Sequence, residues 1–416
     1  MSKPAARMSL TIALCVVSCT WYCWSDVVKP VPDLPKPSDL TWHLKAAEAI
    51  LKGETPYGEI NYDYPPLAGF LAIPLTPLSY IAARWVWFVL SQICLLAAAY
   101  SVWRFLGGGA AALCCVSLVW ASGGAARENF GLGQLGPCLV LLLVITYTRR
   151  DVLGGFATGF GFGLKFIPGV LGLPLLIGRR WKAIAGALIG GFVGFVVPWI
   201  ALYGLSGTKG PQRADYWMGT PATLSWSIPS AVLRILNPAT KGPTLPISWV
   251  RGNGTNNIHL TPRDQLISVA VGAGILLIGS TLVIALTSRL PEGHLPFAMA
   301  GLISLALAAS PISWTHYQLL QYPGVALLCY EAFRRGKWRV LALAAFAGLA
   351  IYQIPVAVLT AYVNRYGGWT AESPETLYVW TDVTPAACLL LFGLQLCAAR
   401  WQKDVLPASI PRKIRR

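Results

Sequence analysis

The sequence predicts an all-α membrane protein that crosses the bilayer many times. Its 416 residues are 55% hydrophobic and only 12% charged, and the mean hydropathy of +0.56 is far above that of an ordinary soluble domain. Apolar runs close to the roughly 20 residues that a spanning helix needs recur along the whole chain. We therefore expect residues 1–416 to form a single integral membrane domain.

The positive charge of the chain is arranged around these apolar runs. The formal net charge is +16, with 33 Lys and Arg against 17 Asp and Glu, and the basic residues flank the apolar segments. In a membrane protein, flanking cations meet lipid headgroups or phosphate-bearing substrates. We therefore expect membrane lipids as partners, and no nucleic acid.

The apolar runs define about ten candidate membrane segments. They cover roughly residues 8–25, 81–104, 107–122, 134–148, 181–204, 264–288, 295–311, 316–333, 338–362 and 382–400. A further apolar stretch, 152–178, has basic clusters at both ends, so the positive-inside rule requires it to enter the membrane and return to the same side. We predict a short hairpin that turns near Lys165 to Pro168.

Counting the hairpin as two passes gives about 12 transmembrane segments with both termini in the cytoplasm. The loops 26–80, 206–263 and 363–381 then lie on the outer, periplasmic face of a bacterial inner membrane. The loop 206–263 is rich in Gly, Pro, Trp and Asn without a useful helical period, which predicts a lid or an acceptor-binding segment. The first apolar segment is interpreted as a retained signal anchor, and a cleaved signal peptide is the alternative.

The first outer loop places an acidic residue at the start of an expected helix. Residues 39–52 alternate apolar and polar positions with a helical period, which predicts an interfacial amphipathic helix. Its expected apolar face comprises Leu40, Leu44, Ala47 and Leu51. Ser38 or Asp39 occupies the N-cap, Gly53 follows the last turn, and His43 lies one turn after Asp39 on the same side. Asp39 is thus either a candidate for chemistry or simply a helix cap.

A second acidic cluster follows at Tyr62, Asp63 and Tyr64. It leads through Pro65-Pro66 into a run that ends at Pro77, which is too short to span the membrane and predicts a second helix at the outer interface. The two prolines hold the cluster in a rigid turn. Such a turn suits the wall of a substrate site and, equally, a plain structural corner.

Further polar residues are expected at the outer ends of later segments. This group comprises Arg127, Glu128, Gln134, Lys165, Trp314, His316 and Tyr317. Polar side chains at membrane depth need partners and mark candidate functional sites. His316 stands in a Ser-Pro corner between aromatic residues and is suited to donate to a phosphate or a sugar. The structural alternatives are a hydrogen-bonded interface histidine, an Arg127–Glu128 ion pair and a Lys165 side chain that snorkels to the surface.

The order of these motifs resembles that of glycosyltransferase family 87. The residues that carry the resemblance are Asp39-Leu40, Ala46-Ala47, Gly53 to Tyr57, Tyr64-Pro65-Pro66-Leu67, Gly133-Gln134, Lys165 to Pro168 and Ser310 to His316. The resemblance implies the GT-C membrane fold and a polyprenyl-phosphate sugar as donor, as in the polyprenol-phosphate-mannose-dependent enzymes that extend phosphatidylinositol mannosides. It implies transfer of a hexose, mannose in those enzymes, to a lipid-linked or glycolipid acceptor.

Carried to this chain, the resemblance makes Asp39 the catalytic base and His316 an active-site partner, with Gln134 and Lys165 near the donor. The base would remove the acceptor hydroxyl proton as that oxygen attacks the anomeric carbon in one inverting step. Cations, Arg234 among them, would stabilise the departing phosphate. The residues alone leave the choice between Asp39 and Asp63 open, and it is the resemblance that favours Asp39.

The chain also departs from the family pattern at a few positions. His43 stands where the family usually has a tyrosine, Tyr317 where it has a second histidine, and Thr223-Leu224-Ser225 where it has an Asn-Gln-Ser stretch. These differences leave the acceptor and the donor sugar open.

Other chemistries have less support. The ten cysteines fall inside apolar segments, away from histidines at ligand spacing, so we expect no metal and no cofactor besides the donor substrate. The alternative functions are a transporter or flippase for a lipid-linked or anionic solute and a polymerase or ligase of lipid-linked glycans. Transport is disfavoured because the two halves do not look alike and the polar residues concentrate at one face.

Overall fold

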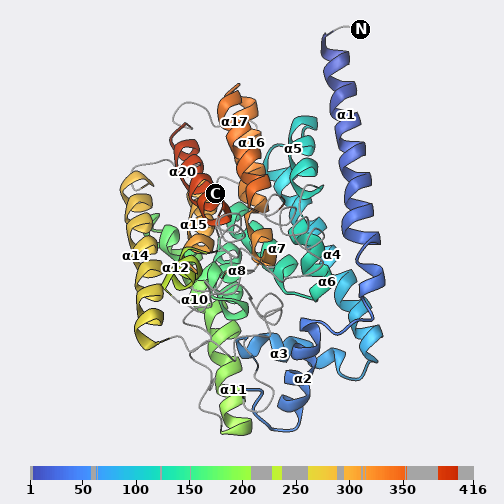
Figure 1. Cartoon of the computed structure of the whole chain (residues 1–416), viewed down its shortest axis with the longest axis vertical. Helices are drawn as coiled ribbons and strands as arrows, with labels where there is room; N and C mark the ends of the chain where they lie inside the picture. The colour runs from blue at the N-terminus through green and yellow to red at the C-terminus, as the bar shows by residue number, and fades with distance from the viewer. Residues whose placement is uncertain are drawn as a thin grey trace.

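The computed structural model describes residues 3–57, 62, 64–121, 124–149, 151–207, 227–236, 261–287, 295–310, 313, 315–351, 353 and 383–401. Every regular element in these ranges is a helix (Figure 1). The all-α prediction is therefore confirmed for the described part of the chain.

The first half of the chain contains a long N-terminal helix, short helices and then a set of packed apolar helices. In order these are α1 (Lys3–Tyr22), η1 (Cys23–Val28), η2 (Val31–Asp33), α2 (Asp39–Leu51), α3 (Pro66–Ala72), η3 (Ile73–Leu75), α4 (Tyr80–Phe105), α5 (Ala110–Ala121), α6 (Gly124–Leu132), α7 (Gly136–Thr148), α8 (Val152–Leu164), η4 (Ile167–Leu171), α9 (Gly172–Ile177), α10 (Trp181–Gly191), η5 (Phe192–Val196) and α11 (Val197–Ser206).

The second half completes the bundle. Its elements are α12 (Ile228–Leu236), α14 (Pro262–Thr287), α15 (Leu295–Ala309), η10 (Thr315–Gln321), α16 (Tyr322–Arg334), α17 (Trp338–Ala350) and α20 (Val383–Trp401). Helix α15 lies at the centre of the bundle, because all its residues from Pro296 to Ala309 are buried and it packs against α14, α16 and α20.

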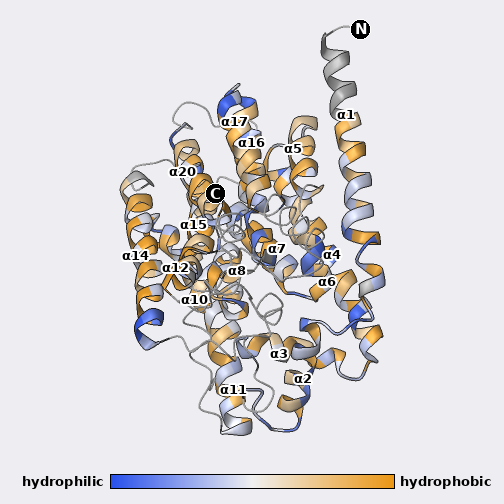
Figure 2. Cartoon of the chain, viewed as in Figure 1, coloured by the Kyte–Doolittle hydropathy of each residue, from blue (hydrophilic) through white to orange (hydrophobic). Residues whose placement is uncertain are grey.

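Four helices of the described residues are long and apolar enough to cross a membrane. They are Tyr80–Phe105, Trp181–Ser206, Pro262–Ala285 and Val383–Trp401, and the bent pair α5 and α6 makes a fifth if it is one span. Figure 2 shows the long hydrophobic stretches of these helices. The chain is thus a membrane protein by length and composition of its helices, and the count of about 12 passes stays a prediction.

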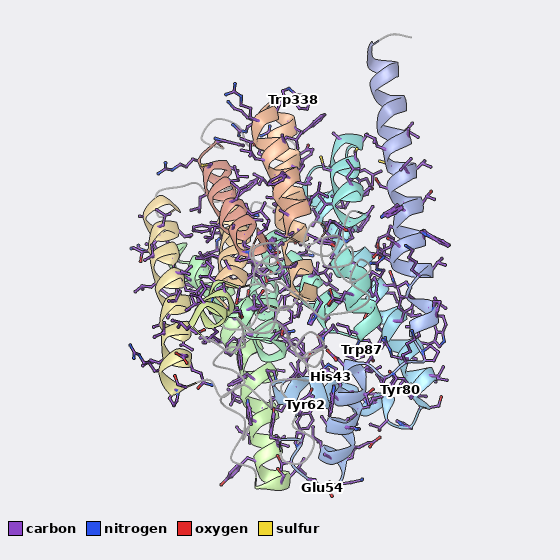
Figure 3. The ribbon with its side chains drawn as sticks, viewed as in Figure 1. His43, Glu54, Tyr62, Tyr80, Trp87 and Trp338 are labelled. Atoms are coloured by element: carbon purple, nitrogen blue, oxygen red, sulfur yellow. The ribbon has the colours of Figure 1, made fainter. Side chains whose placement is uncertain are left out.

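The helices connect two opposite ends of the molecule. The N-terminal end of α1 and the junction between α16 and α17 lie at one end, uppermost in Figure 1, whereas α2, α3 and the last turn of α11 lie at the other. Figure 3 marks the two ends with Trp338 and Glu54. The end that carries α2 and α3 is called the α2 end below.

Helix α2 forms where the amphipathic pattern predicts it. Ser38 is the N-cap residue, so Asp39 is the first helical residue and its carboxylate does not act as the cap. Gly53 follows the last turn with a φ of 73°, the left-handed conformation that ends helices. The predicted faces need one correction: Leu51 is 59% exposed and the apolar face is centred on His43, which is fully buried. The reason is that the aromatic cluster around His43 covers that part of the helix.

The stretch 152–178 contains the predicted break near Lys165. Helix α8 ends at Leu164, and η4 begins at Ile167 and packs back against α8. Along its other face α8 packs against α10 at backbone contact, since a Cβ on Gly155 would lie 1.7 Å from the carbonyl oxygen of Ala183. Glycine allows the two helices to approach this closely. Together these contacts hold the turn at Lys165 in place.

One helix forms within loop 206–263, where the sequence shows no helical period of useful length. Helix α12 spans Ile228–Leu236, with Pro229 in its first turn and the Ser227 hydroxyl accepting from the backbone N–H of Ser230 at 3.3 Å. A helix of nine residues is shorter than the window over which a helical period can be recognised. Most of this loop and all of 363–381 lie outside the described residues.

Candidate active site

The Asp39 carboxylate is held by side chains from two other parts of the chain. Its Oδ2 accepts a hydrogen bond from Nε2 of Gln134, which lies in the turn between α6 and α7. The same Nε2 lies 2.9 Å from the hydroxyl of Tyr64, just before α3. Residues 39, 64 and 134 therefore converge at the α2 end, although up to 95 residues separate them in the sequence.

Lys165 supplies the positive charge beside this carboxylate. Its Nζ lies 3.5 Å from the ring centroid of Tyr317 and 5.4 Å from that of Tyr64. Contacts over ring faces stabilise a cation without neutralising it. Burial lowers the pKa of Lys165 to about 7, and the neighbouring Asp39 opposes this shift by favouring the charged ammonium. The break between α8 and η4 thus directs a lysine to the acidic residue predicted to be the base.

The protonation of Asp39 reflects a balance between burial and these partners. Burial raises the pKa of Asp39 above its usual range, although Lys165, Gln134, Tyr64 and, less strongly, Arg84 oppose the shift. A carboxyl whose pKa is raised binds a proton more readily than an ordinary aspartate does. The group is therefore suited to accept a proton from a hydroxyl that is being activated.

His316 approaches the same region from η10. The side chain is buried, and its Nδ1 lies 3.9 Å from Oε1 of Glu128 on α6. Its backbone carbonyl accepts from Nδ2 of Asn129 at 2.8 Å, which fixes η10 against α6. The His316 ring meets Tyr317 edge to face at 4.7 Å, and the Lys165 charge acts on it as well as on Asp39. Asp39 and His316 therefore share Lys165 as a common neighbour.

His43 occupies an aromatic cluster behind Asp39. Its Nδ1 lies 2.8 Å from the hydroxyl of Tyr62, and its ring packs edge to face against Tyr64 and stacks on Trp87 (Figure 3). Burial, with a smaller effect of Lys165, lowers the pKa of His43 to about 3. The imidazole is therefore neutral, and it packs against the ring of Tyr64, which Lys165 also contacts.

Comparison with known proteins identifies the family. The family model described as glycosyltransferase family 87 matches residues 62–311, which is more than half of the chain. The chain belongs to glycosyltransferase family 87. The resemblance found from the sequence motifs is thereby confirmed.

Two mycobacterial mannosyltransferases are among the chain's relatives. The chain is 28% identical over 288 residues to the polyprenol-phosphate-mannose-dependent alpha-(1-2)-phosphatidylinositol pentamannoside mannosyltransferase of Mycolicibacterium smegmatis, which covers 66% of this chain and 62% of that relative. It is 23% identical over 395 residues to the polyprenol-phosphate-mannose-dependent alpha-(1-2)-phosphatidylinositol mannoside mannosyltransferase of Mycobacterium tuberculosis, which covers 86% of this chain and 85% of that relative.

The other residues predicted for the active site of this family 87 chain lie in different parts of the molecule or outside the described residues. Arg127 interacts with Asp26 of η1, and Oε1 of Glu128 lies 3.9 Å from Nδ1 of His316. Arg234 lies on α12, and its side chain is outside the described residues, as are Asp63 and Trp314. Within the described ranges, no three His, Cys, Asp or Glu side chains gather as metal ligands would.

Sequence reasoning missed one cation next to this site. Arg84 is the fifth residue of α4 and is fully buried. It interacts electrostatically with Asp39, and its Nη2 donates to the carbonyl oxygens of Phe130 and Gly131 at 3.0 and 2.5 Å. An arginine at the start of an apolar run is usually a flanking cation at the membrane surface, so only the folded chain reveals that it is buried.

Proposed function

We propose that this chain is a membrane hexosyltransferase that transfers mannose from a polyprenyl-phosphate donor to a glycolipid. The family match and the names of both mycobacterial relatives support this proposal. Those names also specify a phosphatidylinositol mannoside as acceptor, and we extend that acceptor class to this chain. The departures at His43 and Tyr317 are where the acceptor of this chain would differ.

The proposal includes the membrane arrangement. It is a GT-C fold of about 12 passes in a bacterial inner membrane, with cytoplasmic termini and the α2 end on the periplasmic side. The position of the α16–α17 junction at the opposite end supports this orientation, because Arg334, Arg335 and Lys337 gather there. Basic residues of that kind favour the cytoplasmic side.

The proposed reaction is a single displacement at the anomeric carbon. Asp39 accepts the proton of the acceptor hydroxyl, the hydroxyl oxygen forms the new bond to the anomeric carbon, and the bond from that carbon to the phosphate oxygen breaks. The polyprenyl phosphate leaves as an anion, so no strong general acid is required. Lys165 and His316 would stabilise its charge, with Gln134 holding the base. The configuration at the anomeric carbon inverts.

One observation carries this mechanism: the amide of Gln134 and the charge of Lys165, from two distant parts of the chain, both act on the carboxylate of Asp39. The test uses the purified protein in phospholipid nanodiscs, polyprenyl-phosphate [¹⁴C]mannose and a phosphatidylinositol mannoside extract. Asp39→Asn should lower transfer to glycolipid on the order of 10²- to 10⁴-fold, because the base is lost. Glu48→Gln is the matched control, since Glu48 is an exposed acid on the same helix.

The same assay decides between the two acids. Asp63→Asn should retain most of the transfer activity. If Asp63→Asn abolished transfer and Asp39→Asn did not, Asp63 would be the base. Absence of any glycolipid product from the wild type with this donor would contradict the proposed activity itself.

A further inference from the structure

The N-terminal part of α4 contains a buried guanidinium whose partners are unusual. Arg84 is fully buried, and Nη2 is bound to two backbone carbonyls at the C-terminal end of α6. In the described part of the chain, its Nε and Nη1 have no acceptor in hydrogen-bond geometry, and Tyr80, four residues earlier on α4, is the side chain that interacts most strongly with the guanidinium. A buried cation with few partners costs stability, and such groups persist where function requires them.

Arg84 also packs directly against the turn that presents Gln134. The chain leaves α6 through Gly133, whose φ is 69°, and a Cβ on Gly133 would lie only 2.9 Å from Nη1 of Arg84 and 3.0 Å from Cβ of Leu40. The turn is therefore enclosed between the guanidinium and the first turn of α2. Gln134, the next residue, donates to Asp39. The carbonyls bound by Arg84 lie only three and four residues before Gln134, so this bond fixes where the turn begins.

The start of α4 also contacts the segment that precedes Asp39, the residue to which Gln134 donates. The Tyr80 hydroxyl donates to the carbonyl of Lys36 at 2.6 Å and lies 3.1 Å from Oγ of Ser38. Ser38 is the N-cap of α2 and directly precedes Asp39. Tyr80 and Arg84 are four residues apart on α4. Tyr80 contacts the segment before Asp39, and Arg84 contacts the segment before Gln134, so α4 supports both partners of the Asp39–Gln134 hydrogen bond.

We infer that Arg84 is a positioning residue, which holds Gln134 against Asp39 and adds a permanent positive charge behind that carboxylate. The inference rests on the proposed function, in which Asp39 is the base. Arg84 acts through the α6 carbonyls and the Gly133 turn, since neither a donor nor an acceptor sugar needs to touch it. A displacement of about 1 Å in such a pair is enough to lower a rate on the order of 100-fold.

A purely structural role would have a different signature. If Arg84 only capped α6, its loss would lower the free energy of unfolding and leave the pH dependence of the folded enzyme unchanged. If Arg84 supports the base, its loss also raises the pKa of Asp39. Burial raises this pKa, and Arg84 lowers it together with Lys165, Gln134 and Tyr64. The acid limb of kcat/KM then moves to higher pH.

The experiment measures kcat/KM for mannosyl transfer against pH in Arg84→Met, Arg84→Lys and Arg104→Met. Arg104 is the matched control, because it lies exposed in the last turn of the same helix. We expect Arg84→Met to lower kcat/KM roughly 10- to 100-fold and to move the acid limb to higher pH. Arg84→Lys should restore the acid limb, because it restores the charge, and only part of the rate. Arg104→Met should behave as the wild type.

Two outcomes separate this inference from the proposed function. An Arg84→Met enzyme with wild-type kcat/KM and an unmoved acid limb overturns the inference, while an inactive Asp39→Asn leaves the base assignment intact. A fully active Asp39→Asn enzyme contradicts the base assignment instead, whatever Arg84→Met does.

Gly133→Ala keeps the test decisive if Arg84→Met does not fold. Its added Cβ would lie 2.9 Å from Nη1 of Arg84 and 3.0 Å from Cβ of Leu40, at a φ of 69° that disfavours alanine, so the turn is displaced and kcat/KM should fall by at least about tenfold. In the double variant Arg84→Lys/Gly133→Ala, the contact with Nη1 is absent and only the strain at φ 69° and the Leu40 contact remain, so the loss should be smaller than the product of the two single losses. Wild-type kcat/KM in Gly133→Ala, or losses that simply multiply, would refute the positioning role.

Discussion

Two carboxylates at opposite ends of this molecule are stabilised in different ways. Glu331, in the last turn of α16, accepts from Nη2 and Nε of Arg334 at 2.8 and 3.0 Å and from Nε of Arg335. Asp39, in the first turn of α2, accepts from the neutral amide of Gln134, and the charges of Lys165 and, less strongly, Arg84 act on it. Both are acids in a chain with few of them, but only Glu331 has two guanidinium groups hydrogen-bonded to it.

The difference indicates which acid is available for chemistry. The oxygens of Glu331 are occupied by donors that carry full charge, and such pairs lie within a few residues of one another along one helix. The positive charge near Asp39 is instead shared with the rings of Tyr317 and Tyr64 and with His316. A carboxylate held this way retains lone pairs for a substrate proton. We therefore interpret the local pairing of Glu331 as structural, and the long-range convergence at Asp39 as support for its proposed role as the base.

The largest effect that tests this contrast is expected from Gln134→Leu. Leucine removes the amide that donates to Asp39, and a hydrogen bond to a charged group is worth about 1.5–3 kcal/mol, so transfer should fall on the order of 10- to 100-fold. Gln92→Leu is a suitable control. Gln92 lies in the middle of α4 and forms hydrogen bonds with the Tyr22 hydroxyl and the Asp26 carbonyl, which belong neither to Asp39 nor to its partners. Equal losses in both variants would mean that Gln134 has only a general packing role.

The sequence predicts this contrast in part. Capping preferences and a helical period locate α2 and put Asp39 at its start, because both signals are local. The partnership of Asp39 with Gln134 spans 95 positions and leaves no trace in local pattern. His316 and Glu128 were both candidates, yet their proximity follows only from the packing of η10 against α6.

The misses have related physical causes. The burial of His43 depends on Tyr62, Tyr64 and Trp87, which arrive from other segments and cover a helix face that the sequence leaves ambiguous. Arg84 looks like an interfacial cation until α6 is folded against α4 and offers its carbonyls. Sequence patterns thus report the helices and their caps, whereas the site depends on which helix ends meet.

A smaller effect is expected from pH. Because burial raises the pKa of Asp39, kcat/KM should decline as pH falls through a value above the usual aspartate range, where the base becomes protonated. Lys165→Met removes the main opposing charge, so the acid limb should move to still higher pH. The raised pKa acts on stability with the opposite sign: its contribution is fully present below the ordinary aspartate pKa and is lost as pH rises through the raised one.

Rate measurements across pH on wild type and Lys165→Met check this, with Lys45→Met as the control. Lys45 is an exposed lysine on α2 whose ammonium lies over the Trp42 ring, so its removal should leave the acid limb in place. An acid limb at the position of an ordinary aspartate, unmoved in Lys165→Met, would argue that Asp39 does not titrate in the catalytic step.

The smallest effect on catalysis is expected at the other carboxylate. Glu331→Gln removes the charge that Arg334 and Arg335 share, and breaking a fully buried ion pair costs roughly 3–5 kcal/mol. The two arginine side chains are 31% and 19% exposed and can regain water, so we expect a loss of about 1–3 kcal/mol in the free energy of unfolding. Denaturant unfolding in detergent micelles measures this loss, and transfer per folded molecule should equal that of the wild type. A Glu331→Gln enzyme that unfolds normally but transfers as poorly as Gln134→Leu would show that pairing with two guanidinium groups does not distinguish a structural acid from a functional one.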